Sequence, residues 1–167
     1  PAVVAADPFK RISEESGMAI KPGTDLFLPQ RPNSKGWDLS NRPTLEAIDK
    51  ARDPFRCHQW SATPLTAAQE QYQGDKLGLY NPALPQDYLG TMQLTTESDV
   101  KTAIGDATPW DASPEQRAEI LNRVADLYET HFGEIFALLA REAGKTLSDA
   151  VAEIREAVDF LRYYAAN

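Results

Sequence analysis

Few residues of this chain have types and spacings that could do chemistry. Cys57 and His58 are adjacent, but a metal site needs several converging ligands, and a nucleophilic cysteine needs a base from elsewhere in the fold. The 167-residue chain has one cysteine and two histidines, the second being His131. We therefore expect no metal site and no thiol catalysis, and we interpret Cys57 as a buried or idle thiol.

Three carboxylates form the second candidate. Asp149, Glu153 and Glu156 follow one another at steps of four and three residues, so on a helix they share one face. One interpretation is a solvated acidic face beside Arg155 and Arg162. The other assigns Glu156 to a substrate, because a carboxylate attracts an ammonium group or a ring nitrogen and forms charge-assisted hydrogen bonds with it.

A third candidate, Gly144-Lys145-Thr146, has the residue types that end a phosphate-binding loop. The required first glycine is missing, since Leu139 occupies its position, and no buried strand precedes it. We interpret the triplet as a break between helices, and we expect no cofactor to be bound by this segment alone.

Charge and composition exclude several partners. The formal net charge is −8 and Lys and Arg are not clustered, so we expect no contact with nucleic acid or anionic membrane. No apolar run approaches the roughly 18 residues of a membrane span. A single cysteine cannot form an internal disulfide, which favours a reducing, cytoplasmic setting.

The prolines divide the chain into two regimes. All twelve lie between Pro1 and Pro114, so the first part is loop-rich and the second can hold long helices. Within the first part, capping signals predict short helices over 7–16 and 43–52. Residues 21–43 read as an extended connector that must lie against something larger.

The middle of the chain predicts a hairpin and one helix. Short β-prone runs at 77–81 and 88–95 flank Pro82 and Pro85, and a stretch from Trp60 before them reads as irregular. A hairpin alone is marginal and needs a third strand or a packed helix. Thr96 with Asp99 is typical of a helix start. The helix that follows should bury four apolar residues, Val100, Ala103, Ile104 and Ala107.

The last part predicts two long amphipathic helices that pack on each other. Ser113-Pro114 with Gln116 starts the first, whose apolar stripe runs from Ile120 to Leu139. Gly133 could break or bend this helix, and Gly144 should end it. The second spans about 146–165 and places one set of apolar residues on one face: Leu147, Ala150, Val151, Ile154, Val158 and Leu161.

Three motifs resemble a known family. "REAGKT…AEIREAVDFLRYYA" at 141–165 resembles the helix that precedes the cofactor-binding core of aldehyde dehydrogenases. The motif has the form found in the glutamate-semialdehyde branch of that family. Asn81-Pro82-Ala83 with 88–91 resembles the early hairpin of that family. "RPNSKGWDL" at 31–39 resembles the connector of the proline utilisation A family, which joins a proline dehydrogenase to a glutamate-semialdehyde dehydrogenase.

This resemblance implies a domain plan and a fold class. Residues 1–75 would be the connector after a proline dehydrogenase barrel, and 76–167 the N-terminal part of a Rossmann-type α/β aldehyde dehydrogenase domain. The expected fold is α+β and mainly helical. Because the chain stops inside the motif, we expect a fragment whose partner is the remainder of the same polypeptide. The parent is expected to be a homo-oligomer.

The resemblance also implies the reaction. The parent would oxidise proline with FAD, and would then oxidise glutamate semialdehyde to glutamate with NAD. In the resembled branch, the residue matching Glu156 contacts the nitrogen end of the substrate. The nucleophilic cysteine and cofactor motifs of the family have no counterpart here, so the segment alone should be inactive, with no catalytic residue.

Two alternatives stay open. The first is a non-enzymatic helical interaction domain that docks through the stripe from Ile120 to Leu139. The second is the N-terminal piece of a monofunctional glutamate-semialdehyde dehydrogenase, against which the "RPNSKGWDL" connector argues because a monofunctional enzyme has no barrel to leave.

Overall fold

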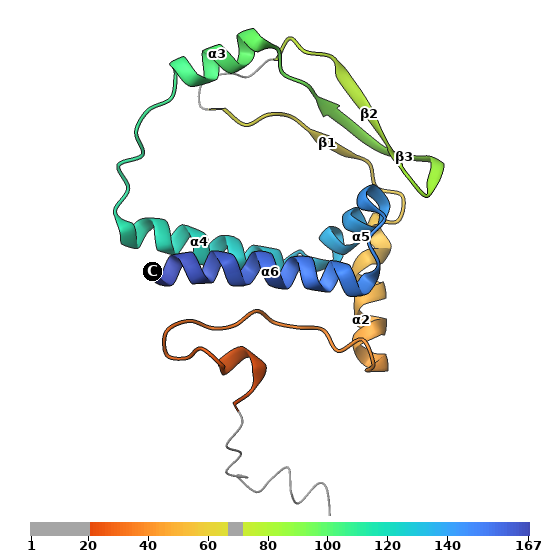
Figure 1. Cartoon of the computed structure of the whole chain (residues 1–167). Helices are drawn as coiled ribbons and strands as arrows, with labels where there is room; N and C mark the ends of the chain where they lie inside the picture. Colours follow the sequence, from red (N-terminus) through yellow and green to blue (C-terminus); the bar gives the residue numbers. More distant parts are fainter. Residues whose placement is uncertain (1–20, 67–71) are drawn as a thin grey trace, which may run out of the picture.

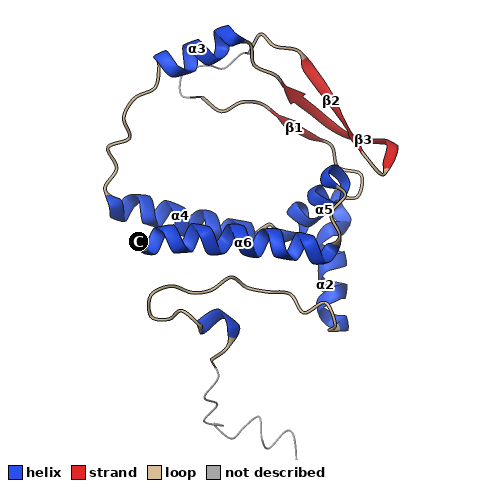
Figure 2. Ribbon diagram, in the orientation of Figure 1, coloured by secondary structure: helices blue, strands red, loops and turns tan. Residues whose placement is uncertain are grey.

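A computed structural model describes residues 21–66 and 72–167, so the helix expected at 7–16 lies outside the described residues. The fold is α+β and mainly helical, as the sequence predicts (Figures 1 and 2). Its elements in chain order are η1 Gly23–Asp25, α2 Arg42–Arg52, η2 Asp53–Phe55, β1 Trp60–Ala62, β2 Lys76–Asn81, β3 Leu84–Gln93, α3 Glu97–Gly105, α4 Pro114–Thr130, α5 Phe132–Ala143 and α6 Leu147–Ala166.

The predicted hairpin is present as β2 and β3, and it has a third strand that the sequence did not reveal. The sheet order is β1-β3-β2, with β2 antiparallel and β1 parallel to β3. Strand β3 starts earlier than expected and includes Pro85, which lies outside the part of β3 that pairs with β1, so its missing N–H interrupts no ladder there. Gly90 has a φ of 131°, and a side chain there would meet the Trp60 carbonyl.

Helix α3 begins as predicted but does not bury the expected residues. Thr96 and Asp99 form a reciprocal capping box. Among the residues expected to be buried, Ile104 is 71% exposed and Val100 and Ala107 are also exposed, whereas the buried residue of the helix is Asp99. The expectation was wrong because the apolar face of α3 has no covering element among residues 21–66 and 72–167.

The first predicted long helix is two helices. Helix α4 ends and α5 begins at His131, whose ψ of 20° departs from helical geometry. Two residues on, a Cβ at Gly133 would lie 2.5 Å from the Ala51 carbonyl oxygen, so the glycine allows α5 to approach α2. Gly144 caps α5 in the left-handed conformation, with a φ of 64°, as expected.

The core lies where α4, α5 and α6 meet α2. Helices α4 and α6 run side by side in opposite directions, and α2 crosses near the start of α6 (Figure 1). The buried residues form one cluster: Ile48, Ala125, Phe136, Ala150, Ile154 and Val158. The apolar face predicted for α6 therefore contributes Ala150, Ile154 and Val158 to this core.

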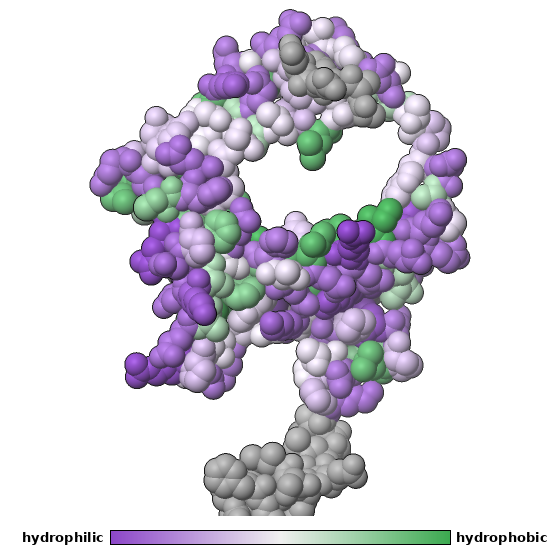
Figure 3. Space-filling model, turned by 180° about the vertical axis from the view of Figure 1, so that it is seen from behind, coloured by the Kyte–Doolittle hydropathy of each residue, from purple (hydrophilic) through white to green (hydrophobic). Residues whose placement is uncertain are grey.

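A wide opening separates the sheet and α3 from the α4–α6 pair, and apolar side chains gather along its edge (Figure 3). Part of the predicted stripe of α4 stays exposed, including Ile120, Leu127 and Tyr128.

In the described ranges, no helix has the length and apolar character needed to cross a membrane.

Candidate functional site

Glu156 lies on an exposed face of α6, at the edge of a shallow pocket. The pocket has a volume of about 260 Å³ and is lined by Arg31, Glu156, Asp159, Phe160 and Tyr163. Four of these residues come from consecutive turns of α6, and Arg31 comes from the segment before α2, residues 21–41, for which we keep the name connector from its predicted role. The pocket thus combines aromatic walls with one cation and two carboxylates.

The other two carboxylates of the predicted acidic face have structural partners. Asp149 accepts hydrogen bonds from the side chain and the backbone N–H of Thr146, which hold its pKa below the usual value. Glu153 pairs with Lys145 at 2.7 Å. Within the described part of the chain, Glu156 makes no hydrogen bond or ion pair. The three residues share a helix, but Glu156 differs from the other two in being available to a ligand.

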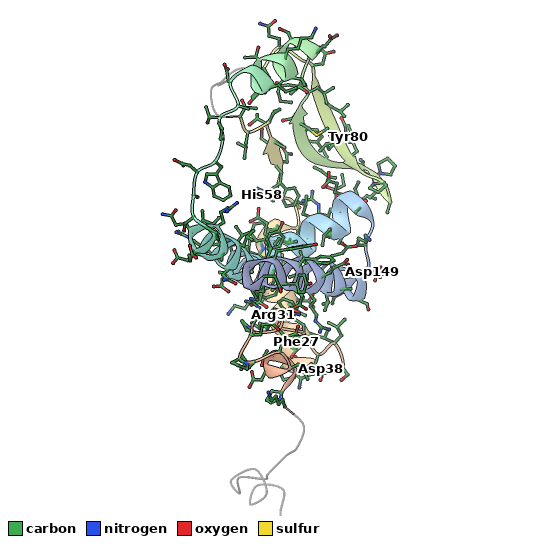
Figure 4. All side chains as sticks on the ribbon, turned by 60° about the vertical axis from the view of Figure 1, so that its left-hand side comes forward. Phe27, Arg31, Asp38, His58, Tyr80 and Asp149 are labelled. Carbon is green, nitrogen blue, oxygen red and sulfur yellow. The ribbon has the colours of Figure 1, made fainter. Side chains whose placement is uncertain are left out.

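The connector is fastened to α6 through Asp159. One carboxylate oxygen accepts the Ser34 backbone N–H at 2.7 Å and Arg31 Nη1 at 3.3 Å, and the other accepts the Ser34 hydroxyl at 2.7 Å. The Arg31 guanidinium also lies 4.1 Å from the centre of the Phe27 ring. Figure 4 shows Phe27 and Arg31 beneath α6, on the side opposite Tyr80 and the sheet.

Arg162 joins the connector to both long helices. It is 6% exposed, donates to the Asn33 carbonyl at 3.2 Å, and lies 2.9 Å from both Asp126 and Glu129 of α4. Burial alone would lower the pKa of Arg162, but hydrogen bonds to Glu129 and Asp126 outweigh it and raise the pKa above its usual value. Arg162 therefore stays charged and links the connector, α4 and α6.

The second half of the "RPNSKGWDL" segment packs against α5. The Trp37 ring lies 5.1 Å from that of Phe132 and 5.2 Å from that of Phe136. The Lys35 backbone N–H donates to Glu129 at 2.5 Å. Polar bonds hold residues 31–35 and aromatic packing holds Trp37, so the segment follows the α4–α6 unit closely.

Cys57 and His58 lie elsewhere, in the turn between η2 and β1. Cys57 is exposed, so of the two predicted descriptions, a buried or an idle thiol, the structure rules out the buried one. The His58 ring packs edge-on between Phe55 and Trp60, and its carbonyl accepts a bond from Arg141 at 2.7 Å. No group of three metal-binding side chains occurs in the described part of the chain. His58 therefore takes part in packing this turn.

Sequence reasoning missed the residue that organises this turn. Arg141 is buried and binds Asp87 of the hairpin at 2.7 Å and 3.1 Å as well as two carbonyls, those of Phe55 and His58. The hydrogen bond from Arg141, with a second from Asn81, holds the pKa of Asp87 below its usual value. Arg141 stands inside the "REAGKT" motif, but nothing local in the sequence indicates its distant partners.

The described residues do not fit a dinucleotide cofactor. Such a site needs a strand followed by a glycine-rich turn and a helix N-terminus. Within 21–66 and 72–167, the strand that leads directly to a helix is β3, and the residues between it and α3 are Leu94, Thr95 and Thr96. No step involving NAD or FAD can therefore be derived from the geometry of these residues.

The chain belongs to the aldehyde dehydrogenase family, whose model matches residues 67–167. Bifunctional protein PutA of Klebsiella aerogenes is 37% identical, over 98% of this chain and 14% of the relative. The 1-pyrroline-5-carboxylate dehydrogenase of Staphylococcus aureus is 30% identical, over 81% of this chain and 27% of the relative. The resemblance that the motifs indicated is thus confirmed, and the chain spans about one seventh of the PutA relative.

A solved structure agrees with the fold. A variant of 1-pyrroline-5-carboxylate dehydrogenase from Thermus thermophilus superposes with a TM-score of 0.71 at 25% identity, over 89% of this chain and 28% of that structure. The predicted fold class, helices and hairpin of an aldehyde dehydrogenase opening, is therefore confirmed.

Proposed function

We propose that this chain is part of a longer bifunctional enzyme that oxidises proline to glutamate. The enzyme uses FAD in a proline dehydrogenase and NAD in a glutamate-semialdehyde dehydrogenase. Residues 1–75 connect the two activities, and 76–167 open the aldehyde dehydrogenase domain. Relatives named for both the bifunctional protein and the 1-pyrroline-5-carboxylate dehydrogenase support this proposal.

The observation that carries the proposal is the contact between the two most informative motifs. The "RPNSKGWDL" segment resembles the connector of bifunctional enzymes, and it bonds directly to the "EIREAVDFLRY" helix through Asp159 and Arg162. The connector bonds to residues of α6 that lie more than a hundred positions later in the chain. These bonds support the view that the connector and the aldehyde dehydrogenase helices form one structural unit.

Glu156 is proposed to bind the nitrogen end of the substrate. Its exposed carboxylate makes no bond with the described residues and lies beside the aromatic walls of Phe160 and Tyr163. Glutamate semialdehyde carries an ammonium group, which a carboxylate would hold by a charge-assisted hydrogen bond. The apolar walls would contact the methylene groups of the substrate. The segment supplies this contact and depends on the rest of the polypeptide for nucleophile and cofactor.

The first experiment is to purify the complete polypeptide that contains this chain and measure its intact mass under denaturing conditions. We expect a mass several-fold above 18.5 kDa, with proline-dependent reduction of a dye and formation of NADH from glutamate semialdehyde. A full-length protein that oxidises neither compound would refute the proposal.

A second experiment tests Glu156 alone. Glutarate semialdehyde differs from glutamate semialdehyde only in lacking the amine, so it is a matched probe. Replacing a charged partner by a neutral one weakens a hydrogen bond by about 1.4 kcal/mol, or about tenfold. Glu156→Gln should therefore lower kcat/KM about tenfold for glutamate semialdehyde and leave glutarate semialdehyde nearly unchanged. Glu119→Gln, which removes an exposed carboxylate from α4, is the control and should change neither.

The remaining properties of the parent are part of the same proposal. It is cytoplasmic and homo-oligomeric, and the 167-residue chain on its own is inactive. The alternative of a helical interaction domain draws on the exposed members of the stripe from Ile120 to Leu139, which are Ile120, Leu127 and Tyr128. A longer polypeptide of the same enzyme would cover those residues equally well, so we do not adopt that alternative.

A further inference from the structure

Helix α6 carries two neighbouring stripes of residues with different tasks. Arg155, Asp159 and Arg162 stand at steps of four and three residues and bond to the connector. Residues 156, 160 and 163 repeat the same steps one position later and line the pocket. Successive residues of an α-helix differ by about 100° in direction, because a turn holds about 3.6 residues. The direction of the second stripe is therefore fixed by whatever holds the first.

The connector bonds to all three residues of the first stripe. Ser34 is bracketed by Asp159, to which it donates two bonds of 2.7 Å, and by Arg155, whose Nε lies 3.4 Å from its hydroxyl. One turn further along, Arg162 binds the carbonyl of Asn33. Asn33 and Ser34 are both buried, so these bonds are shielded from water and are stronger than exposed ones.

The ion pair between Arg31 and Asp159 has a second consequence, because Arg31 lines the same pocket as Glu156. An arginine in that place could bind Glu156 and neutralise the carboxylate that the substrate amine needs. Asp159 accepts Arg31 at 3.3 Å, on the same oxygen that also accepts the Ser34 N–H. Asp159 thereby keeps Arg31 on the connector side of the pocket and leaves Glu156 without a partner from the described residues.

We infer that Asp159 is a positioning residue for the aldehyde site, and that the connector segment Arg31–Ser34 is its partner. Together they set the direction of the Glu156 stripe and keep Arg31 from pairing with Glu156. The connector would then take part in selecting an amine-bearing aldehyde as well as joining two activities. This inference rests on the proposed role of Glu156.

The test compares the two aldehydes in the full-length enzyme. We define selectivity as the ratio of kcat/KM for glutamate semialdehyde to that for glutarate semialdehyde. Misplacing a binding group by about 1 Å can cost on the order of 100-fold in rate. Asp159→Asn should lower selectivity by about 10- to 100-fold, mainly through the KM of the amine-bearing aldehyde, and change the other aldehyde little.

A double variant gives a result that a purely structural role would not produce. In Asp159→Asn we expect the released Arg31 to pair with Glu156, which lines the same pocket, so adding Arg31→Met should recover much of the lost selectivity. Asp159→Asn that slows both aldehydes equally, or a double variant that recovers nothing, would overturn the inference. If Asp159→Asn does not fold, Ser34→Ala replaces it, because that change removes the bonds of the Ser34 hydroxyl to Asp159 and Arg155 and keeps every charge. Ser34→Ala should lower selectivity about tenfold, roughly the effect of one hydrogen bond to a charged group.

Two controls separate this inference from the proposed function. Ser40→Ala removes an exposed hydroxyl that, among the described residues, bonds to Asp38 of its own turn, and it should change kcat/KM for neither aldehyde. Glu156→Gln measures the role of Glu156 itself. If Glu156→Gln leaves selectivity unchanged, both the role of Glu156 and the inference fail. If Glu156→Gln lowers selectivity and neither Asp159→Asn nor Ser34→Ala does, only the inference fails.

Discussion

Removing Arg162 should loosen the whole unit formed by the connector, α4 and α6. The Arg162 side chain is 7% exposed, that of Glu129 16% and that of Asp126 71%. The pair with Asp126 is therefore worth less than about 1 kcal/mol, whereas breaking a buried pair costs about 3–5 kcal/mol because the remaining charge stays buried. Arg162→Ala also leaves the Asn33 carbonyl without its donor. We expect a loss of about 3 kcal/mol, at the lower end because one partner is solvated.

Hydrogen exchange of the α6 amides in the full-length protein measures this loss, because it reports local opening in a protein too large for two-state unfolding. A loss of about 3 kcal/mol corresponds to exchange about 100-fold faster. The matched control is Arg42→Ala, which removes an exposed i,i+4 pair with side chains 88% and 67% exposed and should change exchange less than about threefold. Acceleration below about tenfold, or equal acceleration in the control, would refute this reasoning.

Three further predictions follow from the described contacts. Gly133→Ala places a Cβ 2.5 Å from the Ala51 carbonyl, so α2 and α5 must separate and the Tm should fall, with a cost of about 1–3 kcal/mol; an unchanged Tm would contradict it. The pKa of Asp87 is lower in the folded protein than in the unfolded chain, where it is near 3.8, so the bond to Arg141 stabilises the fold above that pH. This stabilisation is lost as the pH falls through the lower folded-state pKa, so hydrogen exchange of the hairpin amides should rise only below about pH 4. Asp87→Asn should remove that rise. Cys57→Ser should leave aldehyde oxidation unchanged, because Cys57 is exposed and lies outside the residues lining the Glu156 pocket; a large loss of kcat would show that this thiol has a role.

Local signals in the sequence predicted where several helices start and where α5 ends. Thr96, Ser113 and Thr146 each form a reciprocal capping box, and each marks a helix start to within a residue. Gly144 ends α5 because it adopts the left-handed conformation. These signals depend on neighbours three or four residues away, so they can be read without knowing the fold.

Features set by distant partners could not be predicted in this way. Strand β1 is three residues long and pairs with β3 across about thirty residues, so it has no alternation of its own to detect. The exposed stripe of α3 looks like any other amphipathic pattern until the rest of the fold is known. The docking of Ser34 on Asp159 depends on tertiary structure alone, although both residues stand inside motifs that the sequence singled out.

The bond between Arg31 and Asp159 also imposes an order in time on synthesis of the chain, because 128 residues separate the two. A ribosome adds about 5–20 residues per second, so Asp159 is made roughly 6–25 s after Arg31. For most of that interval Trp37 is without its ring partners Phe132 and Phe136, which stand later in the chain. Pausing of translation between the two motifs would therefore lengthen the time that Trp37 spends without these partners.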